Sequence, residues 1–315
     1  MLSRVADSLY WMSRYLERAE HLARVIDVHL NLMLEESTES VDRRWLRVIT
    51  ALGLATDEPS IPGDSYGYAQ AHGFDQITGC ILQARENARQ VREQISSEMW
   101  EQLNRVFLEV KRMGTHDVWD GQPLEFLTTV KESSHLFQGL TDSTMNHGEG
   151  WQFIQTGRYL ERASATAKLL DAHFHEFRQL EELAMDSNVH MEWIGLLRSC
   201  TAFESYCKVY TADLKPERVA EFLLLNSEFP HSIRFAVDQI QQSLEAIHET
   251  TSSKKSGRVA KLAGRLRAEL SFTPLDEIMI NVHDFFEAIR KQCTQIHSVV
   301  HQVYITYPVE AVLES

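Results

Sequence analysis

The chain contains few of the residues that interrupt helices. Only 7 prolines and 14 glycines occur in 315 residues, and they gather in a few places. Long, uninterrupted elements are therefore expected. No apolar run approaches the roughly 18 residues needed to span a bilayer, which argues against a membrane protein. The first residues lack the apolar core and small-residue cleavage site of a signal peptide, so we expect a cytoplasmic protein.

Basic residues and paired cysteines are also scarce. The chain has 31 basic against 45 acidic residues and a formal charge of −14. Proteins that bind duplex nucleic acid need positive surface to displace counterions from phosphates, so nucleic acid is not expected as a partner. Cys80, Cys200, Cys207 and Cys293 lie far apart without a CxxC pair, which excludes the common zinc and thioredoxin spacings. We interpret them as thiols in a reducing compartment.

Familiar catalytic and cofactor motifs are missing. The sequence contains no GxxxxGK[ST] or GxGxxG loop and no GxSxG or HExxH signature. His297 and His301 have a spacing that places two imidazoles on one helical turn, but a metal needs further ligands and no glutamate lies in that turn. We therefore predict that the protein has no metal site and no cofactor of its own.

An internal repeat organises the chain. The sequence Arg-Tyr-Leu-Glu-Arg-Ala at 14–19 recurs at 158–163, and weaker matches follow in the same order, such as Trp45 with Trp193 and Pro123 with Pro274. An ordered series of matches indicates a tandem duplication. We expect one helical repeat in 1–145 and a second in 146–315, packed as one globular unit with a pseudo-twofold relation.

Apolar residues follow the helical period in both halves, and no stretch alternates long enough to form a sheet. The first apolar seam contains Leu2, Val5, Leu9, Met12, Leu16, Ala19, Ala23, Ile26, Leu30 and Met33; the second contains Phe153, Leu160, Ala163, Ala167, Leu170, Phe174 and Phe177. Such long amphipathic helices need partners along their length, so the sequence predicts an all-α helical bundle. We expect the longest loop between Gly53 and Gly73, and Ser232 as a helix N-cap.

The repeated motif carries charged residues away from the apolar seam. Arg14, Glu17 and Arg18 share one helix face, and Arg158, Glu161 and Arg162 repeat the pattern. Exposed positions tolerate substitution, so the retention of these charges calls for a reason. One interpretation is a buried Arg–Glu network that joins the two halves; the other is a polar site that binds a carboxylate or phosphate. The two interpretations are compatible with each other.

A second group of charged residues begins at Arg85 and continues through Glu86, Asn87, Arg89 and Arg92. The three arginines have spacings of four and three residues, which predicts one basic stripe along a helix. Either neighbouring acids such as Glu86 neutralise this stripe, or it recognises an anion, for which the planar guanidinium is well suited.

Four segments resemble the Alpha-E family, a group of bacterial helical proteins named for an invariant Glu-Arg pair. They are SRVADSLYWMSRYLERAEHLARVID at 3–27, ARENARQVREQISSEMWEQLN at 84–104, GRYLERASATAKLLD at 157–171 and EFPHSI at 228–233. The resemblance covers essentially the whole chain. It places the family's Glu-Arg pairs at 17–18 and 161–162 and its REN-R motif at 85–89. The family pattern leads us to expect an arginine where His231 stands, which weakens an anion-binding role for that turn.

The resemblance also implies a context. Alpha-E proteins are associated with circularly permuted ATP-grasp ligases, transglutaminase-like proteins and Ntn-hydrolase-type peptidases in a proposed peptide-synthesis or peptide-modification system. Our leading hypothesis is therefore an accessory subunit that holds a substrate or the ligase and has no catalysis of its own. Two alternatives stay open: an enzyme with Glu17 or Glu161 as general base beside an arginine, and a purely structural homo-oligomer.

Overall fold

The structure is a computed structural model that describes residues 1–33, 38–54, 64–113, 123–177, 187–211, 213–251 and 256–305. Over these ranges the chain is all-α and contains no strand, as the sequence predicts. The first half contains α1 (Ser3–Leu32), α2 (Thr38–Leu52), α3 (Ser65–Gln90), α4 (Ser97–Met113) and α6 (Pro123–Thr144), with a short 3-10 helix, η2 (Arg92–Gln94), after α3.

The second half begins with the long helix α7 and also contains several shorter helices. Its elements are α7 (Glu149–Phe177), α8 (Ser187–Ser199), α9 (Phe203–Tyr210), α10 (Pro216–Leu225), α11 (Ile233–Thr251), α12 (Ser256–Phe272), α13 (Leu275–Ile280), α14 (Val282–Val300) and a π-helical turn, η4 (His301–Ile305). Among the helices described, none is long and apolar enough to cross a membrane.

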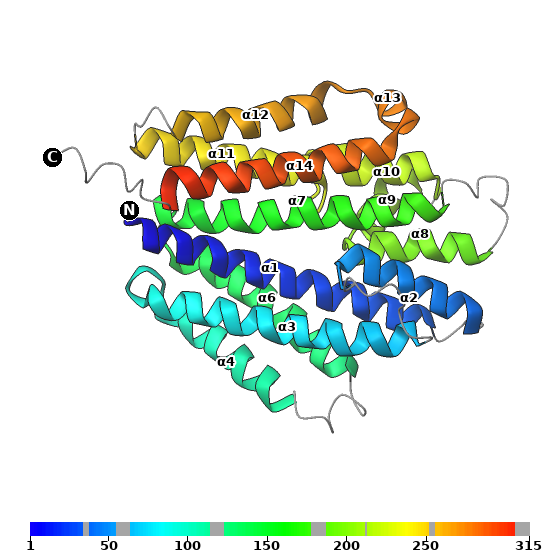
Figure 1. Ribbon diagram of the computed structural model, residues 1–315, viewed down its shortest axis with the longest axis horizontal. Coiled ribbons are helices and arrows are strands. Elements are labelled where there is room, and N and C mark those ends of the chain that lie inside the picture. The colour runs from blue at the N-terminus through cyan, green and yellow to red at the C-terminus, as the bar shows by residue number, and fades with distance from the viewer. Residues whose placement is uncertain are drawn as a thin grey trace.

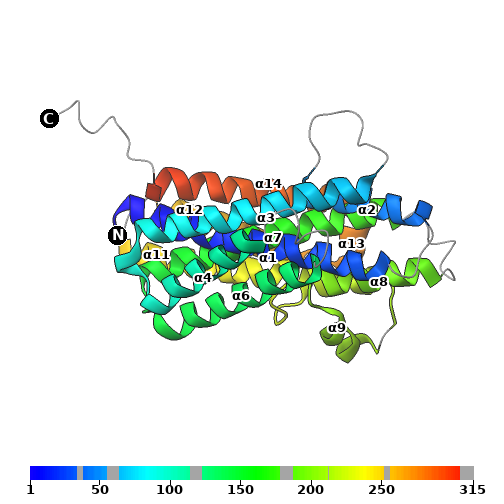
Figure 2. The same ribbon diagram turned by 90° about the horizontal axis from the view of Figure 1, so that it is seen from below.

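Helices α1 and α7 form the middle of the bundle and run in the same direction (Figure 1). On one side, α1 packs against α3 and α6, and α4 covers these two helices. On the other side, α7 packs against α11 and α14, and α12 covers them. The view turned by 90° again shows the long helices aligned with the long axis of the molecule (Figure 2). Both central helices are thus surrounded by helices, so their polar side chains need partners inside the protein.

The second helix of each half crosses to the other half. Helix α2 packs against α7, and α8 packs against α1. Each half therefore has a long first helix, a crossing second helix and an outer group of three longer helices. This correspondence agrees with the predicted duplication, while the superposition of the halves as pseudo-twofold copies stays a prediction.

The predicted apolar seams lie in the core. In α1 the seam residues from Val5 to Ile26 are buried, and all seven predicted seam residues of α7 are buried. Leu2 is an exception, because it precedes the first helical turn and is largely exposed. Burial of these two long apolar seams against each other and their neighbours supplies the main driving force for this architecture.

The predicted loop between Gly53 and Gly73 is wrong at its carboxyl end. Helix α3 begins at Ser65 and includes Gly73. The Asp64 carboxylate caps this helix by accepting a hydrogen bond from the Gly67 backbone N–H at 2.8 Å. Gly73 lies against α1, where an added Cβ would come within 2.5 Å of the Ile26 side chain. Here glycine permits close helix packing and does not mark a loop.

Candidate functional site

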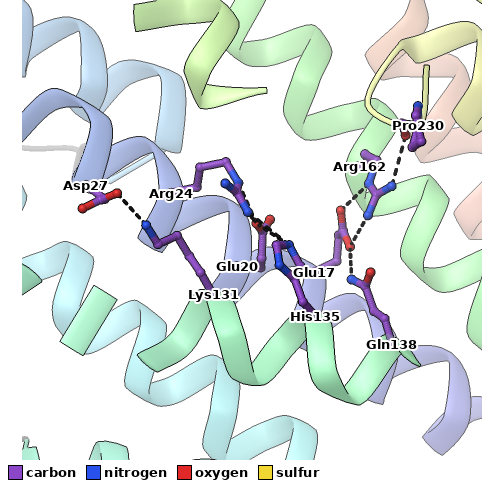
Figure 3. A network of polar contacts seen from close by, with 9 residues as sticks. All are labelled: Glu17, Glu20, Arg24, Asp27, Lys131, His135, Gln138, Arg162 and Pro230. Atoms are coloured by element: carbon purple, nitrogen blue, oxygen red, sulfur yellow. Dashed lines mark hydrogen bonds and ion pairs between the residues drawn. The ribbon is translucent and has the colours of Figure 1, made fainter. Parts of the chain in front are cut away.

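The two Glu-Arg motifs face each other where α1 crosses α7. Glu17 of α1 accepts hydrogen bonds from Arg162 of α7, at 2.5 Å from Nε and 3.0 Å from Nη2. Both side chains are buried, with exposed fractions of 2% and 7%. Gln138 of α6 lies 3.4 Å from the same carboxylate (Figure 3). The predicted buried network that joins the halves is therefore present at this pair.

The reciprocal pair is formed by Glu161 of α7 and two arginines of α1. The Glu161 carboxylate accepts hydrogen bonds from Nε of Arg14 at 2.8 Å and from Nε of Arg18 at 2.6 Å. Burial raises the pKa of the Glu161 carboxyl, but the charge of Arg14 and the hydrogen bond from Arg18 outweigh it, so this pKa lies below its ordinary value. Each half thus supplies the glutamate for the other half's arginine.

A close backbone approach accompanies these pairs. At Gly157 an added Cβ would lie 2.3 Å from Oγ of Ser13 and 2.4 Å from the backbone oxygen of Tyr10. Ser13 occupies in α1 the position that Gly157 occupies in α7, counted from the repeated motif. Because the helices nearly touch at this point, side chains one turn further along can form short ion pairs across the crossing.

The fourth arginine of the motif behaves differently. Arg158 is buried and lies over the ring of Tyr159, with 5.8 Å from its guanidinium carbon to the ring centroid. It forms no hydrogen bond or ion pair with any residue that the structure describes. Its counterpart Arg14 instead donates to Glu161 and, through Nη1, to the hydroxyl of Tyr10 at 3.2 Å. The two halves are therefore not equivalent at this position.

A polar ladder extends from the Glu17 pair along the α1–α6 contact (Figure 3). Glu20 pairs with Arg24, and Nε2 of His135 lies 3.6 Å from the same carboxylate. One turn further along, Lys131 donates to Asp27 at 2.5 Å. Burial raises the pKa of Glu20, but His135 and Arg24 outweigh it and lower this pKa below its ordinary value. Glu20 is thus held as a carboxylate.

The turn before α11 belongs to the same network. Ser232 caps α11, because its Oγ accepts from the backbone N–H of Phe235 at 3.1 Å, as predicted. Nη1 of Arg162 donates to the backbone oxygen of Pro230 at 3.0 Å, so the Glu17–Arg162 pair also holds this turn. His231 is partly buried near Arg162, and desolvation followed by the charge of Arg162 keeps its pKa well below the ordinary value. A neutral imidazole at this place agrees with the weakened case for an anion site.

The predicted arginine stripe is corrected in one respect. Helix α3 ends at Gln90, so Arg92 lies in the following 3-10 turn and not on the helix of Arg85 and Arg89. Glu86 pairs with both helical arginines, at 3.0 Å to Arg85 and 2.8 Å to Arg89, which is the first of the two interpretations that the sequence left open. The backbone turn nevertheless brings Arg92 back to the ring of Trp100, which Arg85 also contacts.

Other contacts hold the rest of this segment in place. Nε of Arg85 donates to Asn104 of α4 at 2.8 Å, and its guanidinium lies over the ring of Phe107 at 4.5 Å. Asn87 donates to the backbone oxygen of Gln83 at 2.8 Å. The side chain of Arg89 is 62% exposed. The segment mainly joins α3 to α4, and only Arg89 and Arg92 offer charge to a partner in solution.

Sequence reasoning missed a third ion-pair group, between α2, α7 and α8. Arg44 is almost fully buried and donates to Glu192 at 2.8 Å, while Arg47 pairs with Glu192 and, at 2.5 Å, with Glu176. Arg44 precedes Trp45 and Glu192 precedes Trp193, the two matched tryptophans. The opposite charges of Arg44 and Glu192 at equivalent positions of the repeat were therefore the sequence signal that could have predicted this ion pair.

Two histidines at equivalent positions lie beside this group. His29 and His173 are buried, and neither Nδ1 of His29 nor Nε2 of His173 has a hydrogen-bond partner among the described residues. Burial, followed by the charge of Arg47, holds the pKa of each well below the ordinary value of 6.5. Both imidazoles are therefore neutral, and they lie against Trp45 and Trp193 respectively.

These geometries define what the charged core can do chemically. A general base needs a carboxylate that can reach a substrate proton and bind it near neutral pH. Glu161 is buried, held by two arginines and shifted to lower pKa. Glu17 is enclosed by Arg162 and Gln138. In the described parts of the chain no group of three or more histidines, cysteines and acids is placed to hold a metal. Both Glu-Arg pairs serve packing of the two halves.

The fold and the crossed pairs define a class: an all-α bundle held at its centre by two copies of a Glu-Arg motif. The sequence model of the Alpha-E family, described as a predicted α-helical domain with a conserved ER motif, matches residues 1–305. The chain belongs to the Alpha-E family, as the sequence resemblance indicated.

Relatives are found among uncharacterised mycobacterial proteins. One from Mycobacterium bovis and one from Mycobacterium tuberculosis are each 23% identical over 342 residues, which covers 97% of this chain. The match covers only 37% of each relative, so this chain spans little more than a third of their length. No solved structure matches the chain.

Proposed function

We propose that this chain is a cytoplasmic accessory subunit of an ATP-grasp amide-ligase system for peptide synthesis or modification. In this role it handles a substrate or scaffolds the ligase, and a circularly permuted ATP-grasp ligase supplies the ATP chemistry. The observation that carries the non-catalytic part is the reciprocal pairing of Glu17 with Arg162 and of Glu161 with Arg14 and Arg18. The carboxylates and guanidinium groups of these residues bind one another, so neither glutamate is available as a general acid or base.

The relatives support the partnership part of the proposal. In each mycobacterial protein the matched region occupies 37% of a longer chain. In these relatives the unit is therefore joined to further sequence. We expect the unit of this chain to act together with a further protein or domain as well. The ATP-grasp assignment of that partner rests on the family resemblance.

Co-purification with an ATP-grasp protein encoded by a neighbouring gene tests this function. We expect the two proteins to co-elute in size-exclusion chromatography, and we expect ATP-dependent ligation, followed by peptide mass and ADP release, to require both. Incubation of the purified chain alone with ATP and peptide is the control. The proposal is wrong if the ligase neither binds the chain nor gains activity from it.

The same experiment decides the enzymatic alternative. Turnover by the purified chain alone, abolished by Glu161→Gln while the fold persists in circular dichroism, would establish catalysis by this glutamate. We expect no such turnover, because a buried carboxylate between two guanidinium groups cannot reach a substrate proton.

A further inference from the structure

A cavity lies in the valley between three helices, away from the Glu-Arg crossing. Helix α7 forms its floor, and α2 and α14, which both flank α7, form its walls. Its volume is about 470 Å³. Cavities of roughly 300–1,000 Å³ hold small-molecule ligands, so this one suits a small molecule or a short chain end and not a folded partner.

The lining is basic in a protein of charge −14. Each helix contributes cations from positions spaced to share a face: Arg43 and Arg47 of α2, Lys168 of α7, and Arg290 of α14. Only two acids, Asp171 and Glu176, also line the cavity. Four basic side chains against two acidic ones make this lining unlike the acidic molecule as a whole.

Both acids are already occupied by neighbours. Asp171 lies 2.5 Å from Nδ1 of His283 and 3.3 Å from Nη2 of Arg290. Glu176 pairs with Arg47 at 2.5 Å. Neither carboxylate is available for a further cation, so the remaining positive charge in the cavity has no acid of the described chain to neutralise it.

That remaining charge resides chiefly on Lys168. This half-buried ammonium forms no ion pair or hydrogen bond with any residue that the structure describes. The Nζ atom of Lys168 lies close to Gly53, the residue after α2. A Cβ added to Gly53 would lie 2.3 Å from this Nζ atom. The carboxyl end of helix α2 offers Lys168 only the partial negative charge of the helix dipole. Burial, followed by the charge of Arg290, lowers the pKa of Lys168, so the site stabilises this cation poorly in the absence of an anion.

A second donor without a partner in the described part of the chain belongs to α14, which forms one wall of the cavity. Nε of Arg290 is buried and has no hydrogen-bond partner among the described residues. A buried donor without a partner is destabilising, which is why most such groups in proteins have one. Lys168 and Arg290 therefore both line the cavity, and each has a polar group without a partner among the described residues: the Lys168 ammonium and Nε of Arg290.

We propose that this cavity binds a small ligand through a carboxylate or phosphate group, with Lys168 and Arg290 as donors and Arg43 at the rim. An oxyanion supplies the negative charge that Lys168 lacks and accepts from a guanidinium through charge-assisted bonds. The remaining volume holds the body of the ligand. This site is independent of the proposed ligase partnership, because binding is a property of the chain alone.

Titration calorimetry of the purified full chain tests the proposal with three probes. Inorganic phosphate tests the phosphate chemistry, N-acetyl-dialanine tests a terminal carboxylate, and its carboxamide is the neutral control. We expect phosphate or the acid to bind with a Kd of about 1 mM or tighter and the carboxamide not to bind. Whichever of the two anions binds identifies the oxyanion, and binding of both indicates a general oxyanion site.

Two matched variants locate the binding. Lys168→Met is expected to weaken binding at least tenfold, with an unchanged or raised melting temperature because it removes a poorly stabilised cation. Lys261→Met makes the same change on the exposed surface of α12 and is expected to leave binding unchanged. The proposal fails if neither anion binds up to about 10 mM, or if Lys168→Met binds as tightly as the parent chain.

Discussion

Replacing equivalent arginines of the two motifs should have very different effects on stability. Arg162→Met leaves Glu17 buried, with an exposed fraction of 2%. Among the residues that the structure describes, only the amide of Gln138 at 3.4 Å remains as a donor. Removing one partner of a buried ion pair costs roughly 3–5 kcal/mol. The change also removes the hydrogen bond to Pro230. We therefore expect a loss of unfolding free energy at the upper end of this range.

Arg18→Met removes the same residue type from the same motif position. The Arg18 side chain is 37% exposed, and Glu161 keeps Arg14 at 2.8 Å and 2.7 Å. A partly exposed pair with a remaining partner contributes about 0.2–1 kcal/mol. Arg18→Met is thus the matched control, and the expected difference between the two variants is several kcal/mol.

Urea unfolding followed by far-UV circular dichroism and tryptophan fluorescence measures both variants, with coincidence of the two probes as the check for two-state behaviour. The double variant Glu17→Met with Arg162→Met should recover most of the loss, because replacing both partners leaves no buried charge. Equal losses for Arg162→Met and Arg18→Met, or no recovery in the double variant, would refute the assignment of Glu17–Arg162 as the central buried pair.

Three further perturbations test other parts of the structure. Gly157→Ala should cost about 1–3 kcal/mol in urea unfolding, since its Cβ meets α1, whereas Gly139→Ala, with open space, should stabilise α6 by about 0.5–1 kcal/mol. Because His173 is neutral when folded and protonates when unfolded, its contribution to the free energy of unfolding should be constant above pH 6.5 and fall as the pH drops below it. His173→Gln should therefore reduce the slope of stability against pH below 6.5 by about 1.4 kcal/mol per pH unit in pH-dependent melting. Arg89→Ala should change stability by less than about 1 kcal/mol, because its pair with Glu86 is exposed.

The periodic pattern was sufficient to predict the central helices but not the start of α3. Ten seam positions over nine turns leave no alternative to a helix for 3–32. The glycines between Gly53 and Gly73 suggested a loop. In a sequence, a glycine that permits close helix packing looks the same as a glycine that marks a loop. Gly73 lies where α3 touches Ile26 of α1, and that contact exists only in the folded bundle. Tertiary packing here overrides local propensity.

The arginine stripe was also mispredicted, because the sequence did not show where helix α3 ends. Spacing places Arg85, Arg89 and Arg92 on one face only if the helix continues, and α3 ends at Gln90. Val91 has a φ of −131° and a ψ of 31°, outside the helical region, so the chain turns here, and the Val91 side chain is buried. Arg92 then reaches Trp100 from a different direction. The position of a helix end decided the geometry, and helix ends are the least predictable part of an element.

The crossed pairs explain why both motifs keep the same two residues. Because Glu17 binds Arg162 and Glu161 binds Arg18, each copy of the motif needs a glutamate for the other copy's arginine and an arginine for the other copy's glutamate. Loss of Glu17, Arg162 or Glu161 leaves a charge in the core without its partner. Loss of Arg18 removes one of the two arginines that bind Glu161, and Arg14 remains. His21 illustrates the converse: the copy in α7 has Ala165 at that position, and Nε2 of His21 has no hydrogen-bond partner among the described residues. The sequence could show that the Glu-Arg pairs were retained. Only the structure, in which α1 and α7 run parallel and cross, shows that the glutamate of each motif pairs with an arginine of the other.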